Sequence, residues 1–141
     1  MKIINEFPPN YHDIIEKINI PADMIVVFAY GPTLYNPSGA KIQDHIIVHE
    51  ETHFRQQLNH SEGIDGWWRE YLNDVSFRLS QELEAYAYQY DFVKKNYSSK
   101  QVRKFLQEIA SLLAGPLYGS MLSAGAAECK IKNKQKRLNM I

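Results

Sequence analysis

The first 40 residues combine short apolar runs with closely spaced prolines and glycines. Isoleucines spaced for one helix face predict a short helix that begins near Tyr11 and is closed by Pro21. These isoleucines are Ile14, Ile15 and Ile18. A β-branched and aromatic run at 24–30, turn residues at 31–33 and a second run at 34–39 predict a small hairpin. The front of the chain therefore predicts one helix and a small sheet.

After residue 40 the apolar positions recur with a helical period. The first such segment spans residues 42–59, and Gly63 and Gly66 are expected to end it. Its apolar positions are Ile42, Ile46, Ile47, Phe54 and Leu58. The aromatic-rich stretch 67–95 predicts one long, buried helix.

Serines mark the starts of two further helices. Ser98 or Ser99 can cap a helix that runs through Ala114, because a serine at this place accepts a hydrogen bond from an unpaired backbone amide. A last helix is expected to begin near Ser123. The chain thus predicts an α+β fold that is mainly helical, with a small sheet near the N-terminus.

Length and composition fit one domain over residues 1–141, with a basic C-terminal tail at about 130–141. The formal net charge is zero, so no global field attracts the protein to nucleic acid or to an anionic membrane. Cys129 has no partner for an internal disulfide. No apolar run reaches the length of a signal peptide core or a membrane span, so we expect a cytoplasmic protein without a membrane partner.

The strongest chemical signal is the sequence HEETH at residues 49–53. On a helix, residues four apart lie on one face, so His49 and His53 can both direct an imidazole nitrogen at one ion. Glu50 projects beside them and can take a proton from a zinc-bound water, whose pKa the metal lowers toward about 7. The pattern predicts one zinc ion per chain and hydrolysis of peptide bonds.

The alternative for this motif is an ordinary helix with two partly exposed histidines. An accidental HExxH is expected about once in a hundred chains of this composition, so chance explains it poorly. Catalytic zinc needs a third protein ligand. The metzincin pattern is excluded, because Gln56 and Asn59 stand where it requires glycine and histidine, and His60 is one residue out of register.

A glutamate from a second helix is the other source of a third ligand. Glu82 and Glu84 are two residues apart, so only one of them can face the metal. The gluzincin pattern ExxAD is similar to Glu82, Ala85 and Tyr86, with tyrosine in place of aspartate. We therefore expect Glu82 to be the ligand, with Tyr86 as a partial substitute for the hydrogen-bonding carboxylate of that pattern.

Five strings of the sequence follow one another along the chain: VVFAYGPTLYNP, HEETHFRQQ, WWREYLND, FRLSQELEAYAYQ and GPLYGSMLS. Over about residues 25–128 the chain resembles the small HExxH zinc metallopeptidases of tailed bacteriophages. The resemblance implies a minimal gluzincin fold, in which the small sheet packs on the HExxH helix and a second helix supplies a ligand. It implies zinc ligands at His49, His53 and Glu82, and a general base at Glu50. It also implies a location in the host cytoplasm or the virion.

These observations favour a zinc-dependent metallopeptidase acting on a peptide or protein substrate. The alternative is a phage structural or interaction protein that keeps the zinc-binding fold with little or no proteolysis. Intact Glu50 favours the enzyme, because structural zinc usually has four protein ligands and needs no such carboxylate. A third hypothesis, nucleic-acid binding through the basic run KIKNKQKR, is weaker, since most such runs are solvated.

Other side chains are candidates for the same site. Tyr86, Tyr118 or Arg78 could stabilise an oxyanion, and the sequence does not choose among them. Gln56 and Gln57 could orient the ligands, but a solvated or interhelical role is expected. By resemblance, the VVFAYG run is the edge on which an extended peptide pairs. The aromatic residues expected in the core are Trp67, Trp68 and Tyr71.

Overall fold

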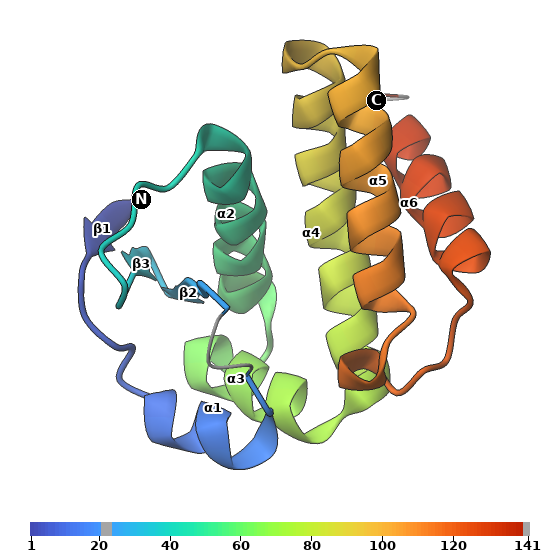
Figure 1. Ribbon diagram of the computed structural model, residues 1–141. Helices are drawn as coiled ribbons and strands as arrows, with labels where there is room; N and C mark the ends of the chain where they lie inside the picture. Colours follow the sequence, from blue (N-terminus) through green and yellow to red (C-terminus); the bar gives the residue numbers. More distant parts are fainter. Residues whose placement is uncertain (21–23, 140–141) are drawn as a thin grey trace. The chain divides into compact units, whose positions relative to one another are not determined.

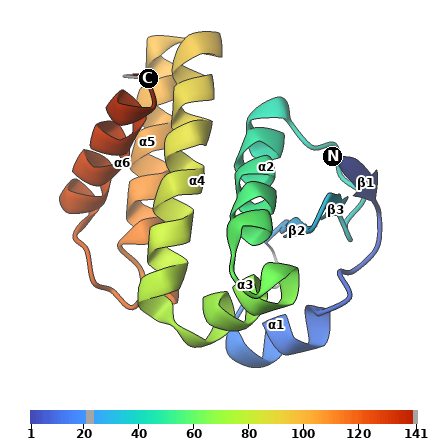
Figure 2. The same ribbon diagram turned by 180° about the vertical axis from the view of Figure 1, so that it is seen from behind.

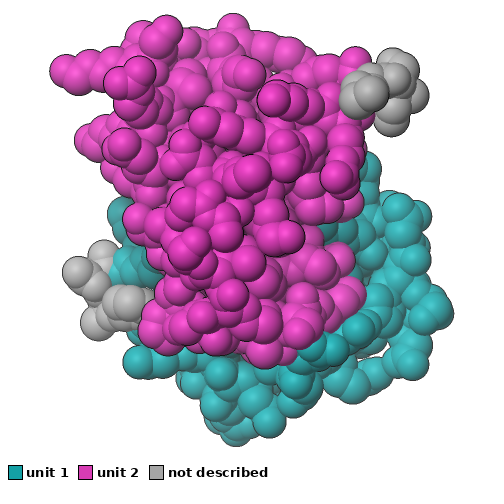
Figure 3. Space-filling view, turned by 90° about the vertical axis from the view of Figure 1, so that its right-hand side faces the viewer, with its two compact units in different colours: residues 1–74 teal, residues 75–141 magenta. Residues whose placement is uncertain are grey.

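A computed structural model describes residues 1–20 and 24–139 of the chain. Its contacts separate into two compact units, residues 1–74 and 75–141, coloured teal and magenta in Figure 3. Each unit is described by itself. A single domain over residues 1–141 would require the two units to associate, so the single domain stays a prediction. Pro21, which was expected to close the first helix, lies outside the described residues.

The first unit contains a three-stranded sheet in the order β1-β3-β2, seen beside helix α2 in Figure 1. The strands are β1 (Lys2–Ile4), β2 (Phe28–Tyr30) and β3 (Thr33–Tyr35). β2 and β3 form the predicted hairpin, with Ala29 opposite Leu34. β1 lies parallel to β3 and was not predicted, because three residues carry too little pattern. The expected strand at 24–30 is shorter than predicted, since β2 begins only at Phe28.

Helix α1 (Tyr11–Lys17) confirms the first predicted helix. Its apolar face is narrower than predicted: Ile14 is buried, whereas Ile15 is 46% exposed. Adjacent helical residues point about 100° apart, so only one of these two side chains can face the core.

Helix α2 (Asp44–Asn59) confirms the helix predicted at 42–59. The two glycines after it do not simply end it, because Gly63 begins the next helix, α3 (Gly63–Asn73). At Gly66 a Cβ atom would lie 2.3 Å from the Cβ of Glu62, so the absence of a side chain lets this turn close tightly.

The long helix predicted at 67–95 is wrong. α3 ends at Asn73, and α4 (Val75–Asn96) begins after Asp74, whose backbone is extended at φ −126° and ψ 104°. Apolar and aromatic residues continue across the break, which is why periodicity alone did not reveal it. Asn73 and Asp74 are the local reason, because their short polar side chains compete for backbone hydrogen bonds and disfavour a helix interior.

The second unit packs α4, α5 (Ser99–Leu113) and α6 (Ala124–Leu138) side by side, as both ribbon views show (Figures 1 and 2). Both predicted starts are confirmed. Ser98 forms a capping box with Gln101, and the Ser123 hydroxyl accepts a hydrogen bond from the amide of Ala126. The core includes Leu79, Leu83, Leu106, Ile109, Leu113, Tyr118 and Ile131.

The basic C-terminal stretch, predicted as a tail, forms part of helix α6 as far as Leu138, and most of its lysine and arginine side chains are exposed. Ile131 and Gln135 are buried, and this apolar and polar burial fixes the helix against its neighbours. Asp91 of α4 accepts hydrogen bonds from Lys95, Gln135 and Asn139, so it joins α4 to α6.

The observed elements confirm an α+β fold that is mainly helical with a small sheet. Among the helices in residues 1–20 and 24–139, none has the combination of length and apolar character that a bilayer crossing demands.

Candidate metal centre

Helix α2 buries its polar side chains. The buried residues are His49, Glu50, Thr52, His53, Gln56 and Gln57. Leu58, one of the apolar positions that predicted this helix, is 62% exposed. A helix normally buries its apolar face, and burying polar groups costs free energy unless they are hydrogen-bonded or bind a ligand. This reversal marks the polar face of α2 as a candidate site.

His49, Glu50 and His53 come together on that face. Each offers one ligand atom, and these atoms all lie within 4.8 Å of one another. The two imidazoles are perpendicular, with ring centroids 4.8 Å apart, and their Nε2 atoms lie 3.1 Å apart. The helical spacing of HExxH therefore produces the predicted convergence.

The distance between the imidazole nitrogens fits a shared metal ion. Two nitrogen ligands at about 2.05 Å from a tetrahedral zinc ion lie about 3.3 Å apart. The observed Nε2 to Nε2 distance of 3.1 Å is close to this value. Imidazole nitrogens with a carboxylate form a donor set that suits zinc. The buried His49, Glu50 and His53 group could hold a metal ion.

His53 is enclosed by aromatic side chains of α3. Its ring centroid lies 5.3 Å from that of Trp67 and 6.4 Å from that of Tyr71. The latter two rings stack on each other at 4.9 Å. These residues and Trp68 are buried, which confirms their predicted place in the core. They limit the directions that the His53 imidazole can take.

Gln56 and Gln57 have specific partners, whereas a solvated or interhelical role was predicted for them. The Oε1 of Gln56 lies 2.8 Å from the Nδ1 of His53, in a buried contact. Gln57 binds strand β2 at two points: its Nε2 donates to the carbonyl of Ala29, and its Oε1 accepts from the amide of Gly31. The sequence signal for these contacts was a glutamine one turn after a predicted metal ligand. Glutamines occur on so many helices that this signal alone does not indicate a contact with the ligand.

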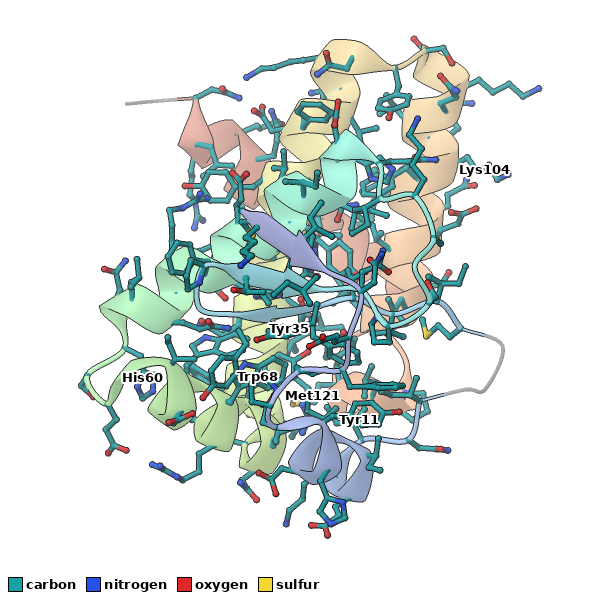
Figure 4. The ribbon with its side chains drawn as sticks, turned by 90° about the vertical axis from the view of Figure 1, so that its left-hand side faces the viewer. Tyr11, Tyr35, His60, Trp68, Lys104 and Met121 are labelled. Carbon is teal, nitrogen blue, oxygen red and sulfur yellow. The ribbon has the colours of Figure 1, made fainter. Side chains whose placement is uncertain are left out.

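Gln57 also occupies part of the strand edge that was expected to pair with a substrate. In the hairpin register Tyr30 faces Thr33, so the polar groups of Ala29 and Gly31 point away from β3. The carbonyl of Ala29 accepts a second hydrogen bond from Nε1 of Trp68, the residue labelled on α3 in Figure 4. An extended peptide could not pair with these two backbone groups without displacing Gln57.

The remaining histidines nearby have other partners. His60, labelled at the end of α2 in Figure 4, has its Nε2 2.8 Å from Glu70 and its Nδ1 accepting from the amide of Glu62. His45 lies one turn before His49, with its Nε2 2.8 Å from Oε1 of Gln43. Burial lowers the pKa of His45, as does the nearby His49 imidazole, while Asp44 partly opposes both. A neutral His45 adds no positive charge beside the candidate centre.

The predicted third ligand, Glu82, belongs to α4 in the second unit. Glu82 is buried, whereas Glu84 is exposed, which fits two positions about 200° apart around one helix. The hydroxyl of Tyr118 donates a hydrogen bond to Oε2 of Glu82 at 3.1 Å. Two residues that the sequence singled out for different roles are thus direct partners.

The other two candidates for oxyanion stabilisation also belong to the second unit. Arg78 is buried, and its Nη1 donates to the carbonyl of Leu117 at 2.7 Å. Tyr86 is partly buried against the hydrophobic core. The packing of this unit gives both residues a structural role, so their catalytic role stays a prediction.

Comparison with known protein families, with curated proteins and with solved structures finds no match to this chain. The functional proposal therefore rests on the residues and geometry of the metal centre.

Proposed function

We propose that this protein is a zinc-dependent metallopeptidase. The observation that carries the proposal is the buried group on α2, in which two imidazole Nε2 atoms lie 3.1 Å apart beside the carboxylate of Glu50. Such a group is costly to bury for packing alone. Its spacing and residue types are those that zinc hydrolysis requires.

His49 and His53 would hold the ion through Nε2, and Glu82 is the proposed third ligand. The support for Glu82 is its match to the gluzincin ligand position, its burial and the hydrogen bond from Tyr118, which would orient the carboxylate. Zinc in such a site acts as a Lewis acid and increases the acidity of water. One ion per chain is expected.

Glu50 is the proposed general base. It follows His49 directly, so its carboxylate lies beside the imidazoles and does not have to ligate the ion. In this role Glu50 would accept a proton from the attacking water and then deliver it to the leaving amine of the cleaved peptide. Tyr118 and Tyr86 are weaker candidates for stabilising charge on the carbonyl oxygen.

The first experiment measures zinc in purified protein. Wild type should carry about one zinc per chain, and His49→Ala or His53→Ala should lose most of it, because the remaining ligands hold the ion poorly. His12→Ala is the matched control, since the side chain of His12 is 82% exposed in its pair with Glu16. Metal-free wild type after expression with added zinc would refute the centre.

The second experiment separates catalysis from metal binding. Glu50→Gln should keep zinc and the fold but abolish hydrolysis, because glutamine cannot accept the proton. Wild type, Glu50→Gln and chelated wild type would be incubated with unstructured peptides and cell lysate, and new termini would be identified by mass spectrometry. Identical products from wild type and Glu50→Gln would refute the mechanism.

A second candidate function is a phage structural or interaction protein that keeps a zinc-binding scaffold. The occupied edge at Ala29 and Gly31 favours it, because those groups are not available to an extended substrate. Zinc-loaded wild type that cleaves none of the peptides would favour this candidate. The phage origin and the cytoplasmic or virion location remain predictions from the resemblance.

A further inference from the structure

The His53 imidazole has different surroundings at its two nitrogens. Its Nε2 lies 3.1 Å from Nε2 of His49, and its Nδ1 lies 2.8 Å from Oε1 of Gln56. Gln56 is three residues after His53 on α2, so the two side chains lie on the same helix face. Both residues are buried.

The chemistry of the amide oxygen fixes the proton on the ring. An amide oxygen only accepts hydrogen bonds, so Nδ1 of His53 must donate to Gln56 and must carry the hydrogen. A neutral imidazole with hydrogen on Nδ1 has its lone pair on Nε2. This is the nitrogen that faces His49, and a metal ligand needs that lone pair.

We propose that Gln56 is a positioning residue that presets the tautomer and direction of His53 for metal binding. This inference rests on the metal centre of the proposed function. Trp67 and Tyr71 restrict the His53 ring from the side, with centroids at 5.3 and 6.4 Å, and Gln56 fixes its rotation. Gln56 thus removes a rearrangement that would otherwise weaken metal affinity.

Two substitutions of Gln56 test the proposal in opposite directions. Gln56→Met keeps the length of the side chain but removes the strong acceptor, so it should weaken zinc affinity by about 10-fold to 100-fold. Gln56→Glu keeps an acceptor at the same place and should retain affinity to within about threefold of wild type. Gln107→Met, on the exposed face of α5, is the matched control.

Zinc affinity would be measured by competition with a chromogenic chelator, using the metal alone. The tautomers would be read independently from ¹⁵N chemical shifts of the histidine ring nitrogens in the metal-free protein. Wild type and Gln56→Glu should show hydrogen on Nδ1 of His53. Gln56→Met should show a mixture of tautomers at His53, which a merely structural role would not produce.

Unchanged affinity and an unchanged His53 tautomer in Gln56→Met would overturn the proposal, as would hydrogen on Nε2 of His53 in wild type. If Gln56→Met does not fold, Gln56→Glu is the deciding variant. Loss of zinc affinity or of the Nδ1 tautomer of His53 in Gln56→Glu would then overturn the proposal. Failure of the peptidase proposal can be distinguished from failure of this one. If the protein binds zinc but cleaves no peptide, zinc affinity and the His53 tautomer still test the role of Gln56. If the protein binds no zinc, the ¹⁵N chemical shifts still show the tautomer of His53.

Discussion

The carbonyl of Ala29 offers a sharp test of how α2 is attached to the sheet. It accepts hydrogen bonds from Nε2 of Gln57 at 2.8 Å and from Nε1 of Trp68 at 3.1 Å. Gln57 is 0% exposed, and its Oε1 is bound to the amide of Gly31. The perturbation is to remove the two donors to Ala29 one at a time and then together, as Gln57→Leu, Trp68→Phe and the double variant.

The expected magnitudes follow from which backbone groups lose their partners. Gln57→Leu leaves the buried amide of Gly31 without this acceptor, which costs about 1 to 3 kcal/mol in the free energy of unfolding. The carbonyl of Ala29 still has Trp68 in that variant. In Trp68→Phe it still has Gln57, so the loss there is mainly one hydrogen bond and some packing, about 1 to 2 kcal/mol.

The double variant removes both donors and leaves the Ala29 carbonyl unpaired. Its loss should exceed the sum of the single losses by about 1 to 2 kcal/mol, which is the cost of orphaning a buried carbonyl. Effects of packing that are independent of the shared carbonyl cancel in this double-mutant cycle. The sign of the coupling therefore tests the shared hydrogen bonding directly.

Urea unfolding monitored by tryptophan fluorescence is the suitable assay. Both tryptophans of the chain lie on α3, so fluorescence reports on residues 1–74, and Trp67 remains as a probe when Trp68 is replaced. Gln107→Leu, at an exposed position of α5, should change stability by less than about 0.5 kcal/mol. Additive single losses, or a loss below about 0.5 kcal/mol for Gln57→Leu, would refute the reasoning.

Three further outcomes are expected. The hydrogen bond to Asp65, together with burial, raises the pKa of Tyr30 to about 12. The stabilisation from this hydrogen bond is therefore complete below the ordinary tyrosine pKa near 10 and is lost as the pH rises through 12. Alkaline unfolding curves of wild type and Asp65→Asn would measure this loss. Burial raises the pKa of Asp91, but the hydrogen bonds from its three donors outweigh burial and lower the pKa overall. The contribution of Asp91 to the free energy of unfolding is therefore present above about pH 4 and is lost on further acidification. Asp91→Asn should make stability less dependent on pH in this acid range. Tyr118→Phe should cost about 1 to 3 kcal/mol in thermal or urea unfolding, because it removes the buried donor to Glu82, and an unchanged midpoint would contradict that role.

Local chemistry in the sequence predicted much of the helical structure and the centre of the site. His49 and His53 converge because helical spacing alone puts them on one face. Ser98 and Ser123 begin their helices because their hydroxyls accept from backbone amides three residues later. Glu82 and Glu84 point to different sides of α4 because they are two residues apart, and the similarity to the ExxAD pattern selected Glu82, which is the buried one.

Tertiary structure decided the features that depend on distant partners. Strand β1 exists because it pairs with β3, some thirty residues later in the chain, and three residues cannot signal that pairing. Gln57 binds the amide of Gly31 and the carbonyl of Ala29, which lie 26 and 28 residues earlier in the chain at the edge of β2. A sequence determines which face of a helix a side chain occupies, whereas a partner on another element is decided only when that element packs against the helix.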